Sequence, residues 1–208
     1  KIALCLPAEE GMRRPEVKIT EAMVRAMREH RVFRSSEGAR VTQRFVECGG
    51  GIDALAVSDD GRVQNRSYPS AHRGWTGQGG WEYVEQLGLD REAPRIGEEA
   101  AALLSADACP AGVTTIVIDA EQMELQVHES VGHPTELDRV YGTEAAYART
   151  SFLKPGDLGS LRYGSEHMNI TPDPTPPLGL GSFGWDDEGS PARRQPVVEG
   201  GILTGYLA

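Results

Sequence analysis

The apolar positions near the start of the chain recur at helical spacing. Residues Thr20–His30 open with a residue that can cap a helix and place Met23, Val24 and Met27 on one side of it. Methionines in such a pattern usually pack in a core. The sequence therefore predicts an amphipathic helix over this segment.

Short β-rich runs separated by turn residues follow over residues 32–68. Glu37-Gly38, Gly49–Gly51 and Asp59–Gly61 are typical of tight turns between strands. The runs between them are Val41–Cys48, Ile52–Ser58 and Arg62–Tyr68. This alternation predicts an antiparallel β-meander.

The pattern then returns to helical spacing. The glycine-rich stretch Gly74–Gly80 has no Lys-Ser/Thr pair after it, so we expect a mobile connector rather than a phosphate-binding loop. Helices are predicted over Trp81–Leu87 and Ala93–Ala106, and Cys109–Gly112 interrupts the pattern. We therefore expect an N-terminal meander region over residues 1–80 and a helical linker over residues 81–112.

The apolar run Val113–Ile118 is typical of a buried strand, and it precedes the segment His128-Glu129-Ser130-Val131-Gly132-His133. Two imidazoles can supply neutral nitrogen donors to a divalent metal. A neighbouring carboxylate can take a proton from a water that the metal activates. His128 and His133 are therefore candidate metal ligands, and Glu129 is a candidate general base rather than a ligand.

The spacing of the two histidines requires an irregular helix. On a regular α-helix, residues five apart lie about 140° apart around the axis, too far for both to reach one metal. A π-type turn would bring His133 back over His128. Gly132 relaxes the backbone there, and Pro134 lacks the N–H that would bond the carbonyl of Ser130. The sequence predicts a π-type bulge near Gly132 and a helix that ends or kinks at Pro134.

Two observations leave open the possibility that the histidine motif is a coincidence. A histidine is usually a surface residue or a satisfied core residue, and two ligands do not complete a catalytic zinc site. His167 is a further histidine, but only a weak candidate for the third ligand. The proline-rich stretch that follows predicts a stiff, extended loop. The favoured interpretation is a plain surface loop, and the alternative is one wall of a substrate groove. Its prolines are Pro172, Pro174, Pro176 and Pro177.

Charge and composition narrow the functional classes. A formal net charge of −10 disfavours non-specific binding to nucleic acid and to anionic membrane surfaces. No apolar stretch approaches the roughly 18 residues of a membrane-spanning helix. The three widely spaced cysteines do not form a disulfide framework, so we expect a reducing, cytoplasmic location.

Several segments together resemble the TldD/PmbA family of metallopeptidases, in particular its TldD branch. The histidine motif, followed by Glu136 and Asp138, is similar to the metal helix of that family. Three further segments resemble a turn, a loop and a hairpin of the family. They are Ser35–Gly38, Asp186–Pro191 and Glu199–Tyr206. The resemblance covers the chain from about Ile19 to its last residue.

The resemblance implies a Zn²⁺ peptidase that cleaves unstructured peptides, such as peptide-antibiotic precursors and antitoxins. It also implies a heterodimer with a sister subunit that lacks the metal motif, or self-association. A downstream cysteine completes the zinc site in the family, and Cys5, Cys48 and Cys109 do not fall at the matching place. We therefore expect the third ligand beyond Ala208, and both ends of the chain to be cuts within a longer protein.

We expect an α+β fold: an antiparallel β-meander with packing helices, then a strand–metal-helix unit leading into a β-rich domain over residues 113–208. The expected activity is zinc-dependent peptide hydrolysis, with His128 and His133 as ligands and Glu129 as base. Two alternatives remain. One is a non-enzymatic regulatory or scaffolding protein, as in the family's older description as a modulator of DNA gyrase. The other is a metal hydrolase that acts on a small amide. The substrate-binding residues stay unassigned.

Overall fold

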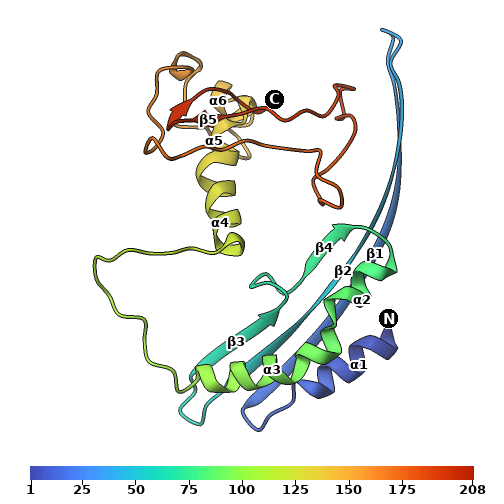
Figure 1. The fold of residues 1–208 in the computed structure, drawn as a ribbon, viewed down its shortest axis with the longest axis vertical. Helices are drawn as coiled ribbons and strands as arrows, with labels where there is room; N and C mark the ends of the chain where they lie inside the picture. Colours follow the sequence, from blue (N-terminus) through green and yellow to red (C-terminus); the bar gives the residue numbers. More distant parts are fainter. The chain divides into compact units, whose positions relative to one another are not determined.

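The computed structural model describes residues 1–208, which divide into two compact units (Figure 1). Unit 1 comprises Lys1–Thr114 together with Pro177–Gly189. Unit 2 comprises Thr115–Pro176 together with Ser190–Ala208. No helix in either unit has both the length and the apolar character needed to cross a membrane.

Unit 1 is built on a four-stranded antiparallel sheet. The long strands β1 (Val17–Arg34) and β2 (Arg40–Val57) form a hairpin and pair along almost their whole length. The short strands β3 (Val63–Tyr68) and β4 (Trp75–Gln78) pair one after the other along the opposite edge of β2. The predicted meander and the α+β class are confirmed, as are the turns at Gly38 and Gly61, which have positive φ angles of 97° and 84°.

Three helices accompany this sheet: α1 (Ile2–Gly11), α2 (Trp81–Leu87) and α3 (Leu89–Leu103). α3 packs against β2 and β3, and α1 packs against α3 and β1 (Figure 1). The predicted helices in this region are confirmed, although α3 begins four residues earlier than expected. The core between helices and sheet consists of fully or nearly fully buried side chains. They are Ala8, Met12, Ile52, Ala54, Ala56, Leu89, Ala93, Ile96, Ala100 and Leu104.

The helix predicted over Thr20–His30 is wrong, because this segment is the centre of β1. Its residues favour helices on their own, but they pair with β2 across the hairpin, and this non-local pairing overrides local propensity. Met23, which the helical pattern placed in a core, is 56% exposed, whereas its neighbour Val24 packs against the unit 1 core. The alternation of exposed and covered side chains is that of a strand.

The turn predicted at Gly49–Gly51 and the mobile connector predicted at Gly74–Gly80 are also wrong. The first segment lies in the middle of β2, and the second contains β4, which pairs with it. A Cβ on Gly49 would collide with the backbone of β4 itself, and one on Gly51 with the backbone just before β4. A Cβ on Gly50 would collide with the backbone of β1. The three glycines therefore permit a close approach of neighbouring backbones instead of reversing the chain.

Unit 2 contains short helices and a small hairpin. Its elements are α4 (Ala120–Val127), η1 (His128–Gly132), α5 (His133–Thr135), α6 (Leu137–Tyr141), the 3₁₀ turn η2 (Pro155–Asp157), β5 (Val198–Glu199) and β6 (Ile202–Leu203). The hairpin expected within Glu199–Tyr206 is present as the antiparallel pair β5–β6. Val131, Val197 and Val198 are buried at the centre of this unit.

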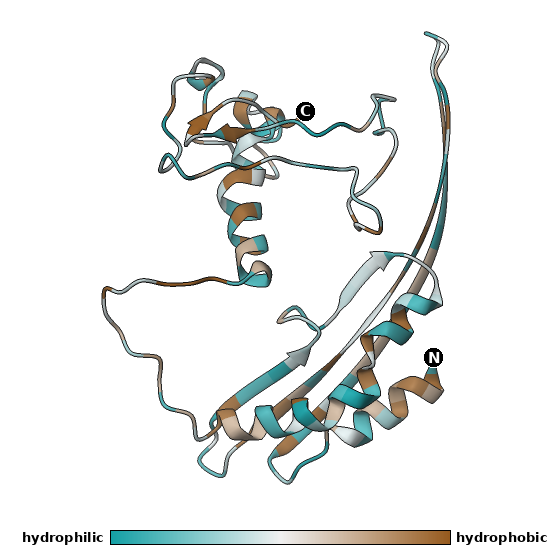
Figure 2. Cartoon of the chain, viewed as in Figure 1, coloured by the Kyte–Doolittle hydropathy of each residue, from teal (hydrophilic) through white to brown (hydrophobic).

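The strand predicted over Val113–Ile118 is absent. The segment is extended without regular pairing, and Val117 is 95% exposed. Figure 2 shows apolar residues along the stretch that precedes α4. A strand needs a hydrogen-bonded neighbour, and no segment of the chain pairs with this one, so its apolar composition alone does not make it a strand.

Candidate metal centre

The motif helix runs from Ala120 to Thr135 as three consecutive segments, α4, η1 and α5. It begins at Asp119, whose side chain accepts a hydrogen bond from the Gln122 N–H at 3.1 Å and caps the first turn. It ends before Glu136, where the backbone becomes extended with ψ 122°. The predicted end of the helix at Pro134 is therefore correct to within two residues.

η1 is a π-type turn, in which the N–H of His133 bonds to the carbonyl of His128. The five-residue step of this hydrogen bond matches the spacing of the two histidines. The predicted π-type bulge is confirmed. The motif spacing and the local backbone geometry thus agree.

The carbonyls around the π-type turn are satisfied by donors from other segments. Because Pro134 has no N–H, the Ser130 carbonyl lacks its usual helical partner, and the Tyr163 hydroxyl donates to it at 2.6 Å. The Ser151 hydroxyl donates to the Pro134 carbonyl at 2.7 Å. The Leu207 N–H donates to the Thr135 carbonyl at 2.8 Å. The sequence predicted the orphaned carbonyl, but it carried no signal that would identify Tyr163 as the donor.

Packing holds the same helix from one side. Val131, in the middle of the π-type turn, is 2% exposed and packs with Val197 and Val198. Tyr163 packs against this cluster, and its burial raises the pKa of its phenol, so the hydroxyl stays protonated and can donate. The buried side of the turn thus leaves the histidines on the more open side.

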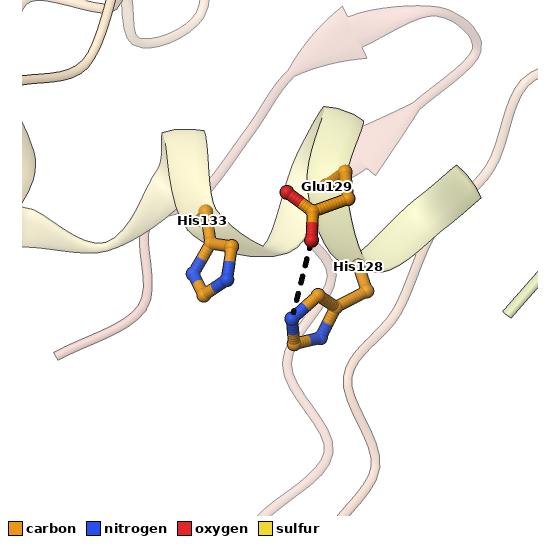
Figure 3. Close-up of side chains that lie close together, drawn as sticks. All are labelled: His128, Glu129 and His133. Carbon is orange, nitrogen blue, oxygen red and sulfur yellow. Dashed lines mark ion pairs between the residues drawn. The ribbon is translucent and has the colours of Figure 1, made fainter. Parts of the chain in front are cut away.

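The three candidate side chains converge. The imidazoles of His128 and His133 have ring centroids 4.3 Å apart and an interplanar angle of 75°. One potential ligand atom from each histidine and one from Glu129 all lie within 4.8 Å of one another. Figure 3 shows the two imidazoles on the same side of the helix, with the Glu129 carboxylate turned toward His128 at 3.9 Å. His128 and Glu129 are mostly exposed, whereas His133 is only 29% exposed.

His133 also contacts a second carboxylate. Its Nδ1 lies 2.8 Å from Oε1 of Glu136, whose Oε2 accepts a hydrogen bond from Nε of Arg139 at 2.6 Å. Burial alone would raise the pKa of Glu136, but the hydrogen bonds and charges of His133 and Arg139 outweigh it and lower that pKa. Arg139 was not identified as a site residue from the sequence. The signal that could have identified it is the three-residue spacing from His133 to Glu136 and from Glu136 to Arg139.

This set of donors fits a divalent metal ion, because two imidazole nitrogens and a nearby carboxylate are the donor types that such ions prefer. No other histidine or cysteine of the chain joins the cluster. His167 and the three free cysteines, Cys5, Cys48 and Cys109, are therefore not part of it.

The sequence profiles of two domains of one family match almost the whole chain. The PmbA/TldA metallopeptidase central domain matches residues 1–106, and the PmbA/TldA metallopeptidase C-terminal domain matches residues 111–208. The chain belongs to the PmbA/TldA metallopeptidase family. The second match contains the complete His128–His133 motif.

Relatives of the PmbA/TldA family extend this result. The metalloprotease MJ0996 of Methanocaldococcus jannaschii is 32% identical over 179 residues, which cover 85% of this chain and 36% of that protein. A Thermotoga maritima protein called a modulator of a DNA gyrase has the same fold, with a TM-score of 0.72 and 20% identity over 100% of this chain and 44% of its own. TldE of Thermococcus kodakarensis gives a TM-score of 0.52 and 18% identity over 90% of this chain and 38% of its own. This chain therefore spans less than half the length of these relatives.

Proposed function

We propose that this chain carries the catalytic helix of a zinc-dependent peptidase that cleaves unstructured peptides. The observation that carries the proposal is the π-type turn, which brings donor atoms of His128, Glu129 and His133 within 4.8 Å of one another. The family's name and the name of its metalloprotease relative support the same chemistry.

Each of the three residues has a distinct role in this proposal. His128 and His133 hold the metal through one imidazole nitrogen each. Bound zinc supplies Lewis acidity, which polarises the scissile carbonyl and makes water a stronger acid. Glu129, exposed and directly beside His128, accepts the proton of the attacking water and returns it to the leaving amine. Its exposure allows a substrate to reach it.

Two imidazoles do not complete a zinc site, which takes three protein ligands in most catalytic centres. We propose that a cysteine outside residues 1–208 supplies the third. A thiolate would add negative charge and a strong bond to zinc. The relatives that the chain matches are more than twice its length, which leaves ample room for such a residue.

We propose that the chain's protein forms a heterodimer with a homologous sister subunit that lacks the metal motif. Self-association is the alternative arrangement. The support for the heterodimer is the likeness in fold to TldE. The three free cysteines support a proposed cytoplasmic location. The acidic net charge of −10 disfavours binding to nucleic acid and to anionic membranes.

The alternative of a regulatory protein without enzymatic activity has less support. The likeness to the protein called a modulator of a DNA gyrase, at 20% identity, concerns the fold alone. A scaffold has no chemical need for a carboxylate beside two converging imidazoles. A hydrolase of small amides uses the same three residues, and it differs from a peptidase only in its substrate.

Replacing Glu129 by Gln in the full-length protein tests the proposal. The side chain keeps its size but can no longer take a proton, so peptide cleavage should fall by about 10²–10⁴-fold or more while metal content stays largely intact. Glu124→Gln is the matched control, since Glu124 is exposed on α4 and is five residues from Glu129. Its activity should equal that of the wild type.

Three other results would contradict these assignments. Loss of metal in step with loss of activity would make Glu129 a ligand. Near-normal turnover would remove it from the mechanism. Cleavage of small amides without cleavage of peptides would favour the amide hydrolase.

A further inference from the structure

We infer that Glu136 and Arg139 are positioning residues, which hold the His133 imidazole in the tautomer with hydrogen on Nδ1 and a lone pair on Nε2. The inference rests on the proposed role of His133 as a metal ligand. It adds two residues to the site that do not touch the metal or the substrate. Neither was assigned a role from the sequence.

The first step is the contact between His133 and Glu136. Nδ1 of His133 lies 2.8 Å from Oε1 of Glu136, a short distance for a hydrogen bond to a charged acceptor. The backbone around Glu136 is fixed, since residues 136 and 207 form a parallel bridge and the Leu137 N–H donates to the Leu207 carbonyl at 2.8 Å. The carboxylate is thus held against the ring from a rigid segment.

The second step concerns the position of the proton. Nη2 of Arg139 also lies 3.0 Å from Nδ1 of His133, so two arrangements compete. Arg139 can only donate, and it would need a bare Nδ1. An ionised Glu136 can only accept, and it would need Nδ1–H. The two contacts cannot both be hydrogen bonds of one neutral ring.

The surroundings of Arg139 decide between them. Its Nε donates to Oε2 of Glu136 at 2.6 Å, and its Nη1 donates to the Ala148 carbonyl at 3.0 Å. This pairing keeps the carboxylate anionic. A bare Nδ1 would then set its lone pair against an anionic oxygen at 2.8 Å, which is strongly repulsive. The proton therefore lies on Nδ1, and Arg139 acts on the ring through the carboxylate.

The third step is the consequence for the metal site. With Nδ1 engaged by Glu136, Nε2 is the nitrogen left to bind a metal, and the ring cannot rotate freely. Hydrogen bonds of this kind fix the tautomer and raise the basicity of histidine ligands. His128 has no comparable partner and is 58% exposed against 29% for His133. His133 is therefore the pre-oriented ligand of the pair, and His128 is the one that adjusts.

Nitrogen NMR of the metal-free chain tests this directly. In the wild type at a pH where His133 is neutral, the ¹⁵N shifts should show Nδ1 protonated and Nε2 bare. In Glu136→Ala the ring should move toward the Nε2–H form. In Glu136→Gln, whose amide oxygen can still accept, the Nδ1–H form should persist in part.

Zinc competition titrations supply the second measurement. Glu136→Ala should bind zinc about 10- to 100-fold more weakly, with Glu136→Gln in between. Glu144→Gln removes one charge from an exposed residue of the same unit and should leave both measurements unchanged.

A wild-type His133 that carries its proton on Nε2 would overturn the inference, as would a Glu136→Ala variant with unchanged tautomer and zinc affinity. Neither measurement depends on catalysis. If peptide cleavage is absent but the tautomer responds to Glu136, the proposed function fails and the positioning role stands. If cleavage is present and the tautomer does not respond, the positioning role fails and the proposed function stands.

Discussion

The two units are stabilised in different ways. Unit 1 has long paired strands, three helices packed on them and a continuous apolar core in which residues such as Ile96 and Leu89 are fully buried. Unit 2 has a π-distorted helix, a hairpin whose two strands have two residues each, and a core cluster of three buried valines, Val131, Val197 and Val198. Many interactions of the same kind hold the first unit, whereas single hydrogen bonds at specific places hold the second.

This difference matches what each unit has to do. Repeated interactions tolerate the loss of any one, but they favour regular geometry. The His128–His133 turn is irregular, and individual donors serve the Ser130 carbonyl within it and the Pro134 carbonyl just after it, namely the hydroxyls of Tyr163 and Ser151. We therefore expect substitutions in unit 1 to change stability alone. In unit 2, smaller changes should alter the site itself.

Ile96→Ala in α3 should give the largest change in stability. The side chain is fully buried between helix and sheet, so its truncation should lower the free energy of unfolding of unit 1 by about 2–5 kcal/mol. Chemical denaturation measures this loss of stability, and amide hydrogen exchange assigns it to one of the two units. Zinc affinity of the folded protein should stay unchanged. A loss of zinc affinity would show that the two units are coupled and would break the comparison.

In both units, features with a local cause could be predicted from the sequence, and features that depend on distant partners could not. The π-type turn followed from the spacing of two histidines together with Gly132 and Pro134, because all the determinants lie within seven residues. The meander followed from turn residues that act locally, as at Gly38 and Gly61. Local chemistry with a local cause could be predicted.

The errors all involve partners distant in sequence. Thr20–His30 is a strand because β2 pairs with it, and Gly49–Gly51 lies inside a strand because another backbone crosses close by. Val113–Ile118 is strand-like in composition but has no partner strand. In the site, the Tyr163 hydroxyl reaches Ser130 across 33 residues of sequence. Pattern and spacing cannot identify such partners.

Val131→Ala is the matched truncation in unit 2. Removing two methyl groups from this 2%-exposed side chain should cost about 2 kcal/mol of the stability of unit 2. Because Val131 lies inside the π-type turn, zinc affinity should fall as well, unlike in Ile96→Ala. Hydrogen exchange of unit 2 and a zinc titration check the two effects. A loss of stability with unchanged zinc affinity would show that the turn survives without its packing.

Tyr163→Phe removes one hydroxyl and sharpens the comparison further. The Ser130 carbonyl loses its donor at 2.6 Å, at a cost of about 1 kcal/mol, because water can partly replace an exposed hydrogen bond. The turn should then relax, and the two imidazoles should converge less well. We expect weaker zinc binding with little change in global stability. Phe152→Leu, at the ring that packs against Tyr163, is a control for packing alone and should leave zinc binding unchanged.

His167→Ala should have the smallest effect. His167 is exposed in unit 2 and lies outside the cluster of His128, Glu129 and His133, so stability should change by less than about 0.5 kcal/mol. With only two imidazole ligands, the chain should bind zinc weakly, and this weak binding should be the same in His167→Ala and lost in His128→Ala. Zinc titration of the three proteins decides the matter. Tight, stoichiometric zinc in the wild type that disappears in His167→Ala would make His167 the third ligand and would remove the need for a cysteine elsewhere.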